Sequence, residues 1–137
     1  MEKEFIPYTE ALALKELGFD EPCFGRWIEP TELSISAPED DEYCQKQHEF
    51  TWTALAPLYQ QAFKWFREKH DKYGVVNIDL SNNLKDKIFV YMVEDKLGYI
   101  IDLESRSEEY NTYEEAEQAC LNKLIEMVKS NLVSKNT

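Results

Sequence analysis

Glycine and basic residues are both scarce in this chain. The four glycines are spaced too widely to form a glycine-rich phosphate-binding loop: Gly18, Gly25, Gly74 and Gly98. Lysine and arginine together number 15 against 27 aspartates and glutamates, which gives a formal net charge of -12. Such a charge repels polyanions and anionic membranes, so we expect neither a nucleic-acid ligand nor a membrane partner.

Cysteine and histidine are also few, which limits metal and nucleophile chemistry. The three cysteines, Cys23, Cys44 and Cys120, are odd in number and scattered, and this favours reduced thiols over a disulfide framework. Cys44 and His48 are the closest approach to a metal-binding pair, but a structural zinc ion needs four ligands and no second pair has recognisable spacing. We therefore expect no metal and no cofactor. A Cys–His nucleophile stays open because such partners meet only in space, yet no local signature supports an enzyme.

Long apolar runs are missing as well. No stretch approaches the roughly 20 consecutive apolar residues of a membrane span. Residues 1–5 lack the charged-then-apolar layout of a secretory signal, so we expect a cytoplasmic protein. The hydrophobic fraction of 43% is too high for a disordered chain, and 137 residues suit a single domain over residues 1–137.

The residues that are present predict an α+β fold. A short helix is expected from about Thr9 to a glycine cap at Gly18, followed by a hairpin with strands at 23–28 and 32–36. A second helix is expected over 57–73 with Gly74 ending it, and then an antiparallel meander of three alternating strands within 76–80, 88–93 and 97–103. A last helix is expected over 112–132, because Thr112 and Glu115 form a capping box at its start.

Two segments fall outside these elements. Residues 37–53 contain a run of four acidic residues and no periodicity, which indicates an acidic loop or insertion whose end is anchored to the core by Phe50 and Trp52. Residues 134–137 are predicted to be a frayed tail. The apolar face of the last helix is predicted to be buried: Tyr113, Ala116, Cys120, Leu121, Leu124, Ile125 and Val128.

The order helix, three antiparallel strands, helix is topologically like that of double-stranded-RNA-binding domains. Those domains bind the phosphates of RNA with basic side chains at the start of the second helix. Here that position carries Glu114, Glu115 and Glu117. We therefore expect no RNA binding by that mode, since a shared topology does not carry a function.

Three strings resemble a known group of proteins: PYTEALALKELGFDEPCF at 7–24, APLYQQAFKWFREKH at 56–70 and NTYEEAEQACLNKLIEMVK at 111–129. They are similar to short phage proteins of unknown function that also occur in Bacteroidetes genomes carrying prophage-like elements. The resemblance implies a phage or mobile-element accessory protein. It implies no activity, cofactor or site residue, and it does not include residues 37–53.

Composition and missing motifs together favour a non-enzymatic binding protein. An acidic face would meet a basic host protein, and in a sharper form of the hypothesis its carboxylates would mimic a nucleic acid. The candidate face comprises Glu39, Asp40, Asp41, Glu42, Glu104, Glu108, Glu109, Glu114, Glu115 and Glu117. The alternative is a small-ligand or enzymatic domain with an aromatic pocket or surface lined by Trp27, Tyr59, Phe63 and Trp65.

Overall fold

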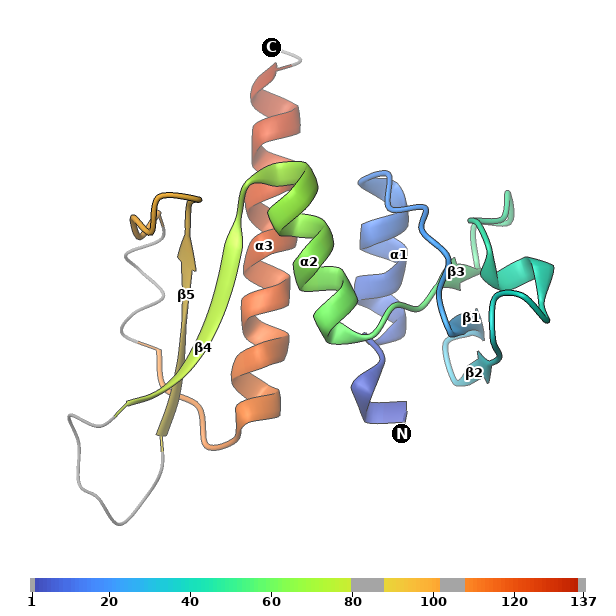
Figure 1. The fold of residues 1–137 in the computed structure, drawn as a ribbon, viewed down its shortest axis with the longest axis horizontal. Helices are drawn as coiled ribbons and strands as arrows, with labels where there is room; N and C mark the ends of the chain where they lie inside the picture. The colour runs from blue at the N-terminus through green and yellow to red at the C-terminus, as the bar shows by residue number, and fades with distance from the viewer. Residues whose placement is uncertain (1, 80–87, 102–107, 136–137) are drawn as a thin grey trace. The chain divides into compact units, whose positions relative to one another are not determined.

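The computed structural model describes residues 2–79, 88–101 and 108–135 and confirms the α+β class (Figure 1). The chain forms two compact units, Met1–Ala62 and Phe63–Thr137. Helix α2, Tyr59–His70, contributes residues to both units. The single domain over residues 1–137 stays a prediction. No helix within the described residues is long and apolar enough to cross a bilayer.

The first unit begins with the short helix η1, Glu2–Glu4, and helix α1, Tyr8–Glu16. The predicted glycine cap of α1 is confirmed, because Gly18 has a φ of 97° that favours a residue without a side chain. The Phe19 N–H donates to the Leu14 carbonyl at 2.9 Å and the Gly18 N–H to the Lys15 carbonyl at 3.1 Å. These are the two bonds of a Schellman ending, and the side chains of Leu14 and Phe19 are both buried beside it.

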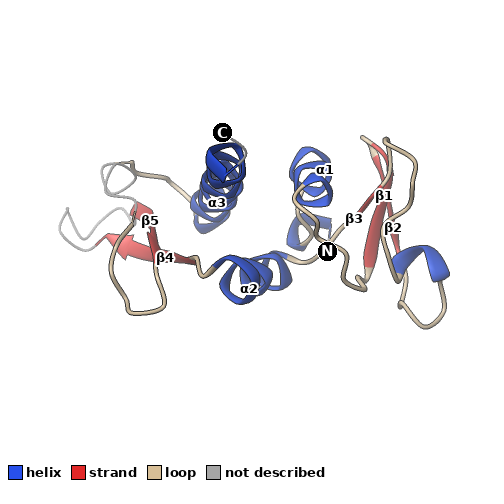
Figure 2. Cartoon of the chain, turned by 90° about the horizontal axis from the view of Figure 1, so that it is seen from above, coloured by secondary structure: helices blue, strands red, loops and turns tan. Residues whose placement is uncertain are grey.

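The first unit also contains a three-stranded antiparallel sheet with the order β2-β1-β3. The predicted hairpin appears as β1, Gly25–Glu29, and β2, Glu32–Ile35. Strand β3, Ala54–Leu55, pairs with β1 and was not predicted, because two residues show no alternation. Helix α1 packs against β1 and β3 (Figure 2).

Helix α2 is shorter than predicted, and the role assigned to Gly74 was wrong. The helix ends at His70, where Asp71 takes a φ of 53° and the chain turns into strand β4, Tyr73–Asp79. Gly74 lies inside β4. A Cβ atom on Gly74 would come within 2.8 Å of both Cys120 Sγ and Phe63 Cε1, so glycine is needed here for close packing.

Strands β4 and β5, Ile88–Glu94, pair antiparallel from Tyr73↔Glu94 to Asp79↔Ile88. A third strand was predicted to begin at Leu97, and this beginning was wrong because Leu97 lies in a turn. The Asp95 carboxylate accepts the N–H groups of Leu97 at 2.9 Å and Tyr99 at 3.0 Å and so builds a tight turn. Of the described residues after this turn, Ile100 forms a single bridge with Glu94; residues 102–103 of the predicted strand lie outside the described residues. The described strands are therefore only loosely compatible with a double-stranded-RNA-binding topology.

Helix α3, Tyr113–Lys135, packs across β4 and β5. The Thr112 half of its predicted capping box is confirmed, because the Glu115 N–H donates to Thr112 Oγ1 at 3.1 Å. Six of the seven residues predicted for its apolar face are buried, and Tyr113 is exposed. The helix continues to Lys135 and so includes the first two residues of the predicted frayed tail, 134–137.

Candidate functional site

A row of four neighbouring aromatic rings, three of them exposed, lies in the acidic segment 37–53 of the first unit. We call Tyr43, His48, Phe50 and Trp52 the aromatic row. Successive ring centroids are 4.7 Å apart for Tyr43 and His48, 5.6 Å for His48 and Phe50, and 4.8 Å for Phe50 and Trp52. The Arg26 guanidinium carbon lies 4.8 Å from the Tyr43 ring centroid, which adds a cation–π contact at that end.

The row is open to solvent. Tyr43 is 41% exposed, Phe50 50% and Trp52 54%, so the prediction that Phe50 and Trp52 anchor the segment to the core was wrong. A soluble protein gains nothing in stability from leaving large rings in water. Adjacent exposed aromatic rings are a common mark of an interaction site.

Polar side chains of helix α1 hold the backbone beneath the row. The Lys15 ammonium group donates to the carbonyls of Phe50 at 2.6 Å and Thr53 at 2.8 Å. Its partial burial lowers the pKa of Lys15 from its ordinary value. The Tyr8 hydroxyl donates to the Trp52 carbonyl at 2.9 Å. The main chain, rather than the rings, is therefore what anchors the end of the segment.

Gln47 fixes the segment just before His48. Its backbone N–H donates to Asp20 Oδ1 at 2.6 Å, and its amide nitrogen donates to the Phe19 carbonyl at 3.0 Å. Its amide oxygen accepts the N–H of Leu55 in strand β3 at 3.0 Å. Gln47 thus ties the row to the residues that follow α1 and to the sheet, which holds the backbone of the row in place.

We expect Gln47→Ala to lower the free energy of unfolding by about 1 to 3 kcal/mol, because it leaves the N–H of buried Leu55 without its partner. Urea denaturation measures the change. The matched control is Gln45→Ala, which removes one exposed hydrogen bond to the Pro38 carbonyl and should cost less than about 1 kcal/mol. Equal costs for the two variants would contradict the anchoring role of Gln47.

The predicted acids at 39–42 adjoin the row but do not share one role. Glu39, Asp40 and Glu42 are exposed. Asp41 is half-buried, and its Oδ1 accepts the Tyr43 N–H at 2.9 Å at the start of the short helix η2, Glu42–Cys44. Three carboxylates are therefore available to a ligand, while Asp41 positions Tyr43.

The remaining predicted acids belong to the second unit, and Glu104 lies outside the described residues. Glu108 Oε2 accepts the Tyr110 hydroxyl at 2.6 Å, and burial together with this bond raises the pKa of Tyr110 to about 12. Glu109, Glu114 and Glu115 are exposed. Burial, and secondly the nearby Glu114 carboxylate, raise the pKa of Glu117.

The raised pKa of Glu117 predicts a pH-dependent gain from Glu117→Gln. Ionised Glu117 destabilises the folded state near neutral pH, and the penalty fades as the pH falls through the raised pKa. We expect the variant to melt higher at about pH 7, with a gain below about 1 kcal/mol because the side chain is partly solvated. At about pH 3 the two proteins should melt alike. A gain that is independent of pH would contradict this interpretation.

The alternative aromatic set is mostly core. Tyr59, Phe63 and Trp65 are buried, and half-buried Trp27 donates its indole N–H to the Ile6 carbonyl at 2.9 Å. Phe63 fills the space above Gly74. The three buried rings therefore offer no exposed stacking surface.

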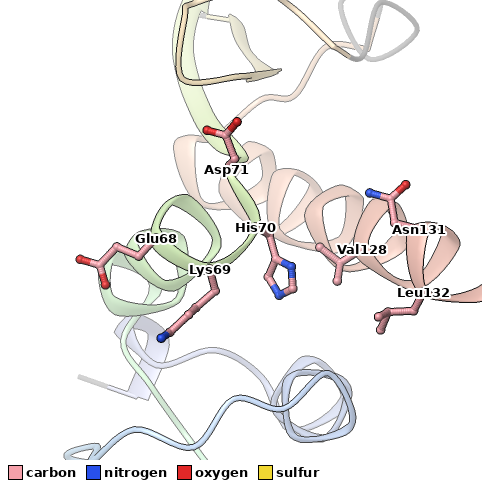
Figure 3. Close-up of a pocket in the computed structure, with 7 residues that line it drawn as sticks. All are labelled: Glu68, Lys69, His70, Asp71, Val128, Asn131 and Leu132. Carbon is pink, nitrogen blue, oxygen red and sulfur yellow. The ribbon is translucent and has the colours of Figure 1, made fainter. Parts of the chain in front are cut away.

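A hollow of about 470 Å³ lies in the second unit (Figure 3), lined by Glu68, Lys69, His70, Asp71, Val128, Asn131 and Leu132. In Figure 3 the carboxylates of Glu68 and Asp71 point away from His70. The His70 ring packs 4.9 Å from the Trp65 ring centroid. The two carboxylates that line the hollow therefore do not converge on His70, as the acids of a catalytic pocket would.

The thiols carry no nucleophile signature. Cys23, Cys44 and Cys120 are buried thiols that form no disulfide with one another. Burial raises the pKa of Cys23 and of Cys44, which keeps both thiols protonated at neutral pH. Within the described part of the chain, no three His, Cys, Asp or Glu residues lie close enough to hold a metal ion.

Comparison with known proteins found no matching family model, no similar curated protein and no similar solved structure. The function must therefore be argued from the geometry of the site. One sequence signal for the aromatic row existed, since His48, Phe50 and Trp52 occupy alternate positions.

Proposed function

We propose that this protein is a non-enzymatic binding protein that engages a basic protein through the aromatic row and the exposed acids beside it. The observation that carries the proposal is the row itself, in which Tyr43, Phe50 and Trp52 are exposed and hydrogen bonds hold the backbone at Phe50 and Trp52. Rigid aromatic side chains bury a large area at a low cost in conformational entropy, and they dominate many interfaces.

Charge selects the kind of partner. Residues 37–53 contain five carboxylates, Glu39, Asp40, Asp41, Glu42 and Glu49, against the single lysine Lys46. This excess attracts cationic surfaces and repels phosphate backbones, so it favours a basic protein over a nucleic acid. The proposed partner is therefore a protein with clustered lysine or arginine.

The proposed setting is the cytoplasm of a bacterial host, where a phage or prophage accessory factor would engage a host protein. The resemblance of the three strings at 7–24, 56–70 and 111–129 supports this origin. Nucleic-acid mimicry is the sharper form of the proposal, because carboxylates near the row would then occupy a site meant for phosphates. Competition between this protein and DNA for the purified partner tests that form.

Affinity capture from host extract with the immobilised full chain tests the proposed function. One variant carries Phe50→Ala and Trp52→Ala, and another carries Glu39→Lys, Asp40→Lys and Glu42→Lys. Asp41 is spared because it positions Tyr43. The matched control carries Glu109→Lys and Glu114→Lys, two exposed acids of the second unit.

We expect a basic protein that the parent and the control capture and that both site variants lose. Its complex should weaken as salt rises from about 50 to 500 mM, because screening shortens the reach of exposed charges. A partner that both site variants capture as well as the parent would overturn the proposal.

A further inference from the structure

We infer that the Trp52 end of the aromatic row binds an arginine side chain of the partner, with the guanidinium plane stacked on the indole ring. The inference rests on the proposed function and deepens it, because it specifies which cation the site takes. The recognised group is then arginine in a protein segment, rather than lysine or a nucleobase.

The first argument is that a guanidinium group already contacts the row at its Tyr43 end. Arg26 of strand β1 lies over the Tyr43 ring at 4.8 Å from the centroid, and the Arg26 Nε atom is buried without a hydrogen-bond partner among the described residues. A guanidinium therefore fits against a ring of this row even where its hydrogen bonds are incomplete. The Tyr43 contact shows a guanidinium carbon over a ring of this row, and we assign the same kind of cation–π contact to Trp52.

The second argument is that Trp52 is the free end of the row. Its one ring contact within the row is with Phe50, at a centroid distance of 4.8 Å, and it is the most exposed of the four. Indole is the ring that binds cations most strongly. The Trp52 carbonyl is held by the Tyr8 hydroxyl, so the backbone that carries the indole is fixed before a ligand arrives.

The third argument separates arginine from its competitors. Guanidinium is planar and more weakly hydrated than an ammonium group, so it stacks on an aromatic face at a lower desolvation cost than lysine. A nucleobase stacks as well, but it brings phosphates toward the exposed carboxylates of residues 37–53. The combination of an open indole and excess negative charge therefore favours arginine.

Titration calorimetry on the full chain tests the inference with three probes at low salt. The first is an acetylated, amidated peptide of alternating glycine and arginine, the second replaces every arginine with lysine, and the third is a single-stranded oligothymidylate. The variant is Trp52→Ala. Its control is Phe24→Ala, because Phe24 is also 54% exposed and lies in the same unit but outside the row.

We expect the arginine peptide to bind more tightly than the lysine peptide and the oligonucleotide not to bind. Trp52→Ala should weaken binding of the arginine peptide about fivefold, and Phe24→Ala should leave it unchanged. Thermal melts confirm that both variants fold. Equal binding of both peptides through Trp52 would overturn the arginine assignment and leave the proposed function standing.

Three other results would also overturn the inference. These are indifference to Trp52→Ala, preferred binding of the oligonucleotide, and no binding of either peptide. If capture of the partner also survives loss of Phe50 and Trp52, the proposed function fails together with the arginine assignment.

Discussion

Leu124→Ala should lower the free energy of unfolding by about 2 to 5 kcal/mol. Leu124 has no exposed surface, and it lies on the buried face of α3, the helix that packs across β4 and β5. Truncation removes a fully buried isobutyl group and leaves a cavity that a close-packed core fills only in part. Leu121, also fully buried on the same helix, should respond in the same way.

Urea denaturation followed by circular dichroism measures this loss. The matched control is Leu132→Ala, because Leu132 lies on the same helix and is exposed. The control should change stability by less than about 1 kcal/mol. If Leu124→Ala and Leu132→Ala lose the same amount, the assigned face of α3 is wrong.

Gly74→Ala should cost about 1 to 3 kcal/mol, the usual range for overpacking. The added methyl group would approach Cys120 Sγ and Phe63 Cε1 to 2.8 Å each, so both side chains must move within a packed core. A thermal or urea melt measures the cost. Gly74 does not have a positive φ, so alanine would cause no backbone strain at this position. The loss of stability would therefore measure the crowding between β4 and the side chains packed against it.

A double-mutant cycle with Cys120→Ala isolates the contact. Removing the sulfur relieves one of the two clashes, so Gly74→Ala should cost less in the Cys120→Ala background than in the parent. If the cost is the same in both backgrounds, the sulfur does not limit the space above Gly74.

Short sequence patterns correctly predicted those parts of the fold that depend only on residues close together in the sequence. The Schellman ending of α1 and the Thr112 cap of α3 are each specified within a few residues, and both are confirmed. Gly74 was misread because a glycine after a helical pattern fits either a helix end or a close approach of backbone. Only the positions of Phe63 and Cys120 decide between the two.

The alternation around Leu97 and Tyr99 was misread for a related reason. An alternating pattern predicts a strand, but the Asp95 carboxylate binds the backbone N–H groups of both residues and closes a turn. Strand β3 was missed because two residues give no period.

The acidic character of the candidate site was predictable from composition, whereas the orientation of its rings was not. Large apolar side chains at the end of a loop usually anchor it, and Phe50 and Trp52 were interpreted in that way. Their exposure depends on Lys15 and Tyr8, which lie 35 to 44 positions away in sequence and bind the carbonyls instead. No local pattern in residues 37–53 predicts that the backbone carbonyls, rather than the rings, anchor the segment.

This arrangement explains how a loop can hold exposed rings in fixed positions. Tyr8, Lys15 and Gln47 satisfy backbone groups that would otherwise stay free, so little ordering entropy remains to be lost on association. In the complex that we propose, the acids nearby would raise the rate of encounter with a basic partner, and the rings would supply contact area.

Hydrogen–deuterium exchange of the full chain, alone and bound to its captured partner, tests the central claim most directly. If the aromatic row and its acids form the interface, peptides spanning residues 42–53 should exchange more slowly in the complex, and peptides spanning 108–117 should be unchanged. Protection confined to 108–117, with residues 42–53 exchanging as in the free protein, would contradict the account.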